Sequence, residues 1–158
     1  MISITGIPKV GKTTICNMLS SYGIECVSAD SVALDLGCME NNTVDLDCMN
    51  SRLLVLPRVI ESHYSHLLMS GHVIILKADP DEIITRMRNA GYSAEKIAEN
   101  IDAQNSDTIY YESIERLPSS RVLSIDLTGR SPSESFGIIK NKIIEIENLT
   151  SRSNYNGS

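Results

Sequence analysis

"GIPKVGKTT", residues 6–14, fits the pattern G-x-x-x-x-G-K-T. The β-branched residues of the segment 2–5 directly before it predict a short buried strand. A helical pattern begins at Lys12 and stops at Gly23. A strand, a glycine turn and a helix in this order are the context in which the pattern indicates a phosphate-binding loop.

The residues of this loop predict how a phosphate is held. Gly6 and Gly11 allow backbone N–H groups to approach phosphate oxygens, and the helix N-terminus adds the positive end of its dipole. Lys12, expected to face solvent, would reach the β- and γ-phosphates, and the Thr13 hydroxyl would coordinate Mg²⁺. The alternative is a glycine turn beside a solvated lysine. The flanking strand and helix favour the nucleotide site.

Further strands and helices alternate along the chain. Strands are predicted over 24–27, 58–61, 72–77 and 121–126, and helices over 45–54, 80–90, 93–116 and from 131. With the first strand, this order predicts an α/β protein: a five-stranded parallel sheet flanked by helices, with the glycine loop at the carboxyl ends of the strands. Residues 1–149 are expected to form one domain. Residues 28–44 read as irregular, and the polar tail 150–158 is predicted to be disordered.

Composition excludes several classes of protein. The 158 residues are 42% hydrophobic and 22% charged, as in an ordinary soluble domain. No apolar run approaches the roughly 20 residues that span a bilayer, and the glycine loop interrupts any signal-peptide core. We therefore expect a cytoplasmic protein. The net charge of −6 argues against non-specific binding to nucleic acids.

The four cysteines, at positions 16, 26, 38 and 48, contain no C-x-x-C pair. Together with the expected cytoplasmic location, this spacing predicts reduced, packed thiols instead of disulfides or a zinc site.

A second group of candidate residues follows the strand predicted over 58–61. Glu61 stands where a Walker B carboxylate would hold Mg²⁺, although a surface glutamate at a strand end is the alternative. His63 is expected to face the phosphates, and His66 to be a structural histidine. A metal site built on these two histidines is disfavoured, because no further ligand cluster accompanies them.

Three segments in order carry a resemblance to a known family. They are "GIPKVGKTT" at 6–14, "ESHYSHLL" at 61–68 and "RMRNAGYSAEKIAENIDAQ" at 86–104. Together they resemble the adenylate kinase isoenzyme 6 family, also called CINAP-like, in its archaeal-type members. The resemblance covers residues 1–146 and implies a P-loop nucleotide kinase with a nucleoside-monophosphate-binding region at about 28–47 and a small lid at about 89–99.

The resemblance also implies roles for individual residues. The ATP phosphates fall to Lys9, Gly11, Lys12, Thr13 and Thr14, with Mg²⁺ at Thr13 and Glu61. Arg130 matches a residue on the adenine side, although it could equally be a solvated turn arginine, and Arg86 matches an arginine before the lid. Catalysis would rest on Lys12, Glu61, His63 and Arg86. The chain departs from the family at Lys9, Glu61, Ser62 and Ala90, and its monophosphate region is short and poor in arginine.

Three functions remain open on this basis. The first is an adenylate-kinase-like enzyme that transfers the ATP γ-phosphoryl to AMP, with a side ATPase activity. The second, also implied by the resemblance, is an ATP-hydrolysing assembly factor in small ribosomal subunit maturation, with a ribosomal protein as partner. The third is a metabolic kinase for another small acceptor, because P-loops serve many substrates.

Overall fold

A single five-stranded sheet forms the centre of the computed structural model, which describes residues 1–155. Its strands are β1 (Ile2–Thr5), β2 (Cys26–Ser28), β5 (Val59–Glu61), β6 (His72–Lys77) and β7 (Val122–Asp126). All pair in parallel, in the order β2-β5-β1-β6-β7, with Ile2 opposite both Val59 and His72. The central strand β1 is fully buried. The predicted five-stranded parallel sheet is confirmed.

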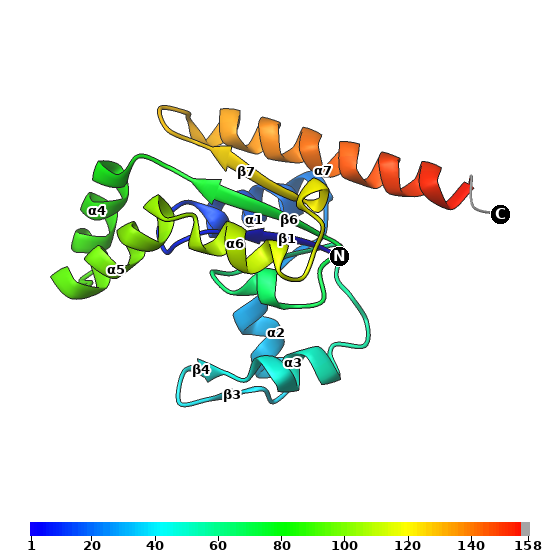
Figure 1. Cartoon of the computed structure of the whole chain (residues 1–158), viewed down its shortest axis with the longest axis horizontal. Coiled ribbons are helices and arrows are strands. Elements are labelled where there is room, and N and C mark those ends of the chain that lie inside the picture. Colours follow the sequence, from blue (N-terminus) through cyan, green and yellow to red (C-terminus); the bar gives the residue numbers. More distant parts are fainter. Residues whose placement is uncertain (156–158) are drawn as a thin grey trace.

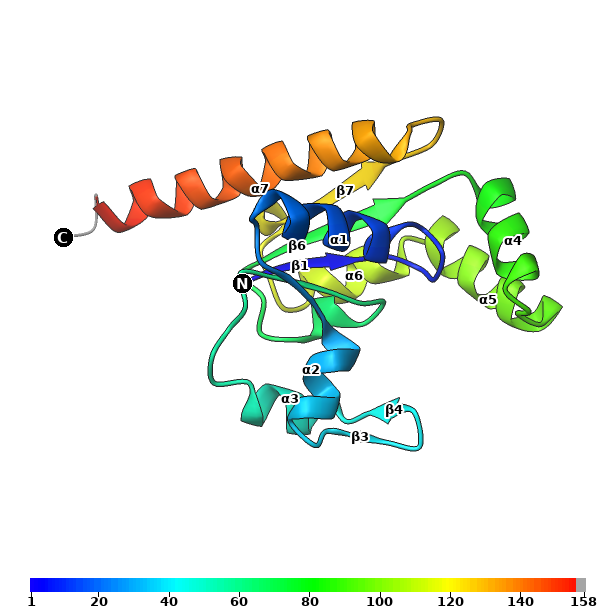
Figure 2. The same ribbon diagram turned by 180° about the vertical axis from the view of Figure 1, so that it is seen from behind.

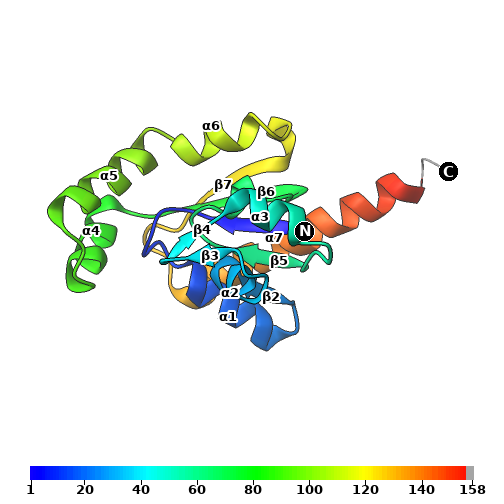
Figure 3. The same cartoon turned by 90° about the horizontal axis from the view of Figure 1, so that it is seen from below.

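Helices cover both faces of the sheet. On one face, α1 (Lys12–Tyr22) packs against α7 (Pro132–Tyr155), as Figure 2 shows. The other face carries α6 (Thr108–Ile114) and the short η1 (Ser65–Leu67), and Figure 3 shows the sheet between the two layers. The main core is built from aliphatic side chains, among them Ile4, Leu19, Ile74, Ile139 and Ile143.

The segment between β2 and β5 projects from the body of the sheet (Figure 1). It folds as α2 (Ala29–Asp35), the antiparallel pair β3 (Met39–Glu40) and β4 (Thr43–Val44), and α3 (Leu46–Arg52). The prediction of an irregular segment at 28–44 was therefore wrong. Asn41 and Asn42 both adopt positive φ, 50° and 59°, which matches the two-residue turn that closes a tight hairpin. Asparagine tolerates this conformation better than most residues.

A second projection, at the carboxyl ends of the strands, is the pair α4 (Pro80–Asn89) and α5 (Ala94–Asn105) (Figure 1). The predicted single helix over 93–116 was wrong at its second half. Asp107 takes φ 53°, which ends α5 and starts α6. The side-chain amide of Gln104 both donates to and accepts from the backbone of Ala78. This pair of bonds fixes α5 to the end of β6.

The carboxyl-terminal helix corrects the prediction of a disordered tail. α7 continues to Tyr155, so residues 150–155 are helical, and residues 156–158 lie outside the described part. The hydroxyls of Thr150 and Ser151 donate to the carbonyls one turn earlier, at Ile146 and Glu147. Serine and threonine therefore satisfy their polar groups locally and remain compatible with the helix. Within residues 1–155 no helix is long and apolar enough to cross a membrane.

Two disulfides contradict the prediction of reduced thiols. Cys16 of α1 is bonded to Cys26 of β2, and Cys38 before the hairpin is bonded to Cys48 of α3. The Cα atoms lie 5.3 Å apart in the first pair and 5.6 Å in the second. In each case the chain reverses within ten residues and brings the two thiols together, which cysteine spacing alone does not reveal.

Candidate active site

The glycine loop connects β1 to α1 and has a backbone that few residues can adopt. Gly6 has φ 149°, and a Cβ added there would lie 2.7 Å from the carbonyl oxygen of Leu76 and 2.9 Å from Cγ1 of Val10. Gly11, the N-cap of α1, has φ 116°. Lys9 also takes a left-handed φ, 67°, although it has a side chain. The loop therefore wraps tightly over the end of the sheet.

Lys12 lies inside this loop. Its ammonium donates to the carbonyls of Gly6 at 2.9 Å and Ile7 at 2.8 Å, and only 8% of the residue is exposed. The expectation of a solvent-facing lysine was wrong, because the loop folds around the side chain. Burial lowers the pKa of Lys12 to about 8, and the carboxylate of Glu61 opposes this shift.

Glu61 ends β5, the strand beside β1, and is buried. Burial raises the pKa of its carboxyl, while Lys12 and the Thr13 hydroxyl act in the opposite direction. A hydroxyl and a carboxylate are the hard oxygen donors that Mg²⁺ prefers, so Thr13 and Glu61 fit this ion. Bound there, Mg²⁺ would neutralise charge on phosphate oxygens.

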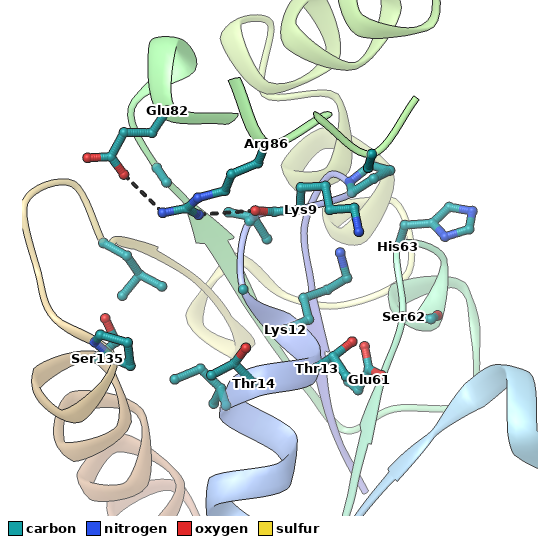
Figure 4. Close-up of a pocket in the computed structure, with 18 of the residues that line it drawn as sticks. Lys9, Lys12, Thr13, Thr14, Glu61, Ser62, His63, Glu82, Arg86 and Ser135 are labelled. Carbon is teal, nitrogen blue, oxygen red and sulfur yellow. Dashed lines mark hydrogen bonds and ion pairs between the residues drawn. The ribbon is translucent and has the colours of Figure 1, made fainter. Parts of the chain in front are cut away.

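The two histidines after β5 lie in different surroundings. His66 is buried, and its ring nitrogens pair with the Thr5 hydroxyl at 3.2 Å and the Glu112 carboxylate at 2.8 Å, so it is a structural residue as predicted. His63 is exposed and lines the same cavity as the glycine loop, and in Figure 4 its ring extends away from Lys9 and Lys12. Partial desolvation and the nearby Lys12 charge lower the pKa of His63, which keeps its imidazole neutral at pH 7.

Asp30 and Tyr64 belong to the site but were missed in the sequence. The Tyr64 hydroxyl donates to the Asp30 carboxylate at 2.6 Å, and burial together with this bond raises the pKa of Tyr64. Asp30 follows the end of β2, the strand next to β5. Its position two residues after Ser28, the last residue of β2, at a strand's carboxyl end, is a signal that could have revealed it.

Arg86 links α4 to the glycine loop. Its guanidinium donates to the carbonyl of Lys9 and to the carboxylate of Glu82, both at 3.1 Å (Figure 4). Arg88 lines a separate groove between α4 and α5 instead. Arg130 follows β7, and its backbone N–H donates to the carbonyl of Leu127.

One cavity of about 930 Å³ collects the predicted catalytic, ATP-binding and Mg²⁺-binding residues. We call it the loop cavity. Among the residues that line it are Lys9, Gly11, Lys12, Thr13, Thr14, Glu61, His63, Arg86 and Arg130.

A second cavity of about 590 Å³, the hairpin cavity, lies between α2, the β3–β4 hairpin and Tyr64. It is lined by Asp30, Leu34, Met39, Asn42, Thr43, Val44, Leu46, His63 and Tyr64. The two cavities share Asp30 and His63.

A five-stranded parallel sheet with a glycine loop, a buried lysine and a facing carboxylate defines the P-loop NTPase fold. Residues 2–107 match the family model described as "AAA domain". The chain is 48% identical over 127 residues to a protein of Thermoplasma acidophilum named "Putative adenylate kinase", covering 79% of this chain and 86% of that one. A protein of the same name from Thermoplasma volcanium is 45% identical over 124 residues, covering 77% and 81%. The chain belongs to this family of archaeal nucleotide kinases.

A solved structure agrees with this fold. A gluconokinase from Sinorhizobium meliloti superposes with a TM-score of 0.58 at 16% identity, over 96% of each chain. At this identity the similarity concerns the fold alone.

Proposed function

We propose that this chain is a nucleoside-monophosphate kinase that transfers the γ-phosphoryl group of ATP to AMP. The names of its archaeal relatives support the choice of reaction. The observation that carries the proposal is the meeting of two cavities at Asp30 and His63. One cavity surrounds the glycine loop and has room for ATP, and the other opens beside it for a second substrate.

The chemistry of this reaction suits the residues at hand. The AMP phosphate is already ionised at neutral pH, so phosphoryl transfer to it needs no general base. Catalysis then depends on orientation and on stabilising the charge of the transferred group. Lys12 would contact the β- and γ-phosphates, Thr13 and Glu61 would hold Mg²⁺, and Arg86 would approach from α4.

A slow ATPase activity is the second part of the proposal. Hydrolysis requires a water molecule to be oriented and deprotonated. His63 is suited to this role because its lowered pKa leaves a neutral imidazole at the junction of the cavities. If hydrolysis dominates, the chain would be an ATP-driven assembly factor, with a small-subunit ribosomal protein as partner.

An assay of coupled ADP formation tests the proposal. ATP turnover is measured alone and with AMP, CMP, UMP or GMP. Stimulation of at least about tenfold by AMP would support the kinase. Turnover that no monophosphate stimulates would reject it and favour the assembly factor, whereas stimulation by a different small acceptor would identify a metabolic kinase.

A further inference from the structure

The hairpin cavity lacks the charge that a nucleoside monophosphate requires. Its lining contains the carboxylate of Asp30 and no lysine or arginine. The segment 28–47 that forms most of it contains five acidic residues and no basic one: Asp30, Asp35, Glu40, Asp45 and Asp47. A phosphate dianion placed among these groups would be repelled. The cation that holds it must come from the loop cavity.

The loop cavity contains four lysine and arginine side chains: Lys9, Lys12, Arg86 and Arg130. Lys12 is buried against the carbonyls of Gly6 and Ile7. Arg86 is paired with Glu82. Arg130 follows β7, which is one edge strand of the sheet. Asp30, at the hairpin cavity, follows β2, which is the other edge strand, so the two residues lie at opposite sides of the sheet.

Lys9, like Arg130, is exposed and forms no ion pair within residues 1–155. It differs from Arg130 in its place, because the glycine loop follows the central strand β1, which pairs with β5, the strand before His63. The Lys9 side chain extends toward the space between Lys12 and His63, away from Glu82 (Figure 4). His63 is one of the two residues shared with the hairpin cavity. The Lys9 ammonium is therefore free and directed toward the junction.

The backbone of Lys9 is also fixed. Its left-handed φ of 67° is unfavourable for a residue with a side chain, and Arg86 donates to its carbonyl at 3.1 Å. A loop position that would suit glycine thus carries a charged residue whose carbonyl is held by Arg86. The loop therefore holds the Lys9 ammonium in a defined place, in addition to reversing the direction of the chain.

We propose that Lys9 binds the phosphate of the acceptor nucleotide and offsets its repulsion from the ATP γ-phosphate. This inference rests on the proposed function and assigns the acceptor-binding cation, which the hairpin segment does not supply. It moves Lys9 from the ATP side, where the family resemblance places it, to the acceptor side.

The test compares Lys9→Gly, Lys9→Arg and the control Arg88→Ala, which removes an exposed cation outside both cavities. Glycine suits φ 67°, so Lys9→Gly removes the charge without straining the loop. We expect Lys9→Gly to raise the KM for AMP by about tenfold or more, as loss of a charge-assisted bond does. The KM for ATP should stay within about twofold. Lys9→Arg should bind AMP almost normally, and Arg88→Ala should change neither KM.

Calorimetric titration of AMP into the ADP-loaded protein separates this inference from the proposed function. If the wild type binds AMP and Lys9→Gly does not, the inference stands even without turnover. If Lys9→Gly binds AMP as tightly as the wild type, or loses ATP affinity to the same extent, the inference is overturned. If the wild type neither binds nor phosphorylates AMP, both fail.

Discussion

Two charged residues of this site, Lys12 and Glu61, are buried in a way that lowers the free energy of unfolding when both are ionised. Lys12 and Glu61 are both buried, and burial shifts each pKa toward the neutral form. Their mutual attraction offsets only part of that shift. The site is thus prepared for a polyanion and a cation, both of which would stabilise these charges.

Lys12→Met tests this view. Since burial lowers the pKa of Lys12 from 10.5 to about 8, the ammonium destabilises the folded protein at pH 7. We expect the variant to lose phosphoryl transfer while its free energy of unfolding rises by roughly 1–3 kcal/mol. Urea denaturation at pH 7 measures the change. A marked fall in stability would mean that the bonds from Lys12 to the loop carbonyls outweigh the desolvation of its charge.

His63→Gln should separate the two proposed reactions. We expect it to reduce ATP hydrolysis by about 10²-fold and to leave AMP phosphorylation within about threefold, because only water needs a base. The lowered pKa of His63 means that the wild-type hydrolysis rate should persist below pH 6.5 and fall only when the imidazole finally takes up a proton. His72→Gln, on β6, is the matched control. Equal losses in both reactions would refute the role as a base.

Arg86→Ala should lower AMP-dependent turnover by about 10²-fold, because it removes a cation near the transferred group and the support of the Lys9 carbonyl. Arg88→Ala, on the groove side of α4, should have little effect. Steady-state kcat values for the two variants decide the matter. The reverse order of effects would place Arg88 at the site.

At the scale of elements, two segments that project from the sheet are each fixed by a specific bond. The bond between Cys38 and Cys48 closes the segment of the β3–β4 hairpin, and Gln104 fixes α5 to Ala78. The bond between Cys16 and Cys26 ties α1 to β2. The hairpin segment contributes most of the hairpin cavity, so its bridge belongs to the proposed acceptor site.

Loss of the Cys38–Cys48 bridge should therefore affect both stability and acceptor binding. By loop-closure entropy, the pair of changes Cys38→Ser and Cys48→Ser should lower the free energy of unfolding by about 2–3 kcal/mol. The KM for AMP should rise and the KM for ATP should not. Cys16→Ser with Cys26→Ser is the matched control, with a similar loss of stability. An unchanged KM for AMP would show that the hairpin segment keeps its shape without the bridge.

At the scale of the whole molecule, the sequence predicted the features that local patterns encode, namely the glycine loop and the parallel sheet. The strand, glycine loop and helix around Lys12 are contiguous in the chain, and the alternation of strands and helices determines the parallel sheet. Three of the features that were missed depend on tertiary contacts or on one unusual residue. Lys12 is buried by the folded loop, the disulfides require chain reversals, and Asp107 breaks a helix whose pattern continues on both sides.

The candidate site shows the same division. The predicted catalytic, ATP-binding and Mg²⁺-binding residues all line the loop cavity, because the carboxyl ends of β1, β5 and β7 meet there. Asp30 and Tyr64 were not predicted, since their pairing joins α2 to the segment after β5 across 34 residues of chain.

The fate of the γ-phosphoryl group distinguishes a nucleoside-monophosphate kinase from an ATPase. The protein is incubated with AMP and ATP radiolabelled at the γ-phosphoryl, and the products are separated by chromatography. We predict that the label appears chiefly in the β-phosphoryl of ADP, with a minor fraction as inorganic phosphate. Label found almost entirely in inorganic phosphate, at a rate that AMP does not change, would contradict the assignment as a nucleoside-monophosphate kinase.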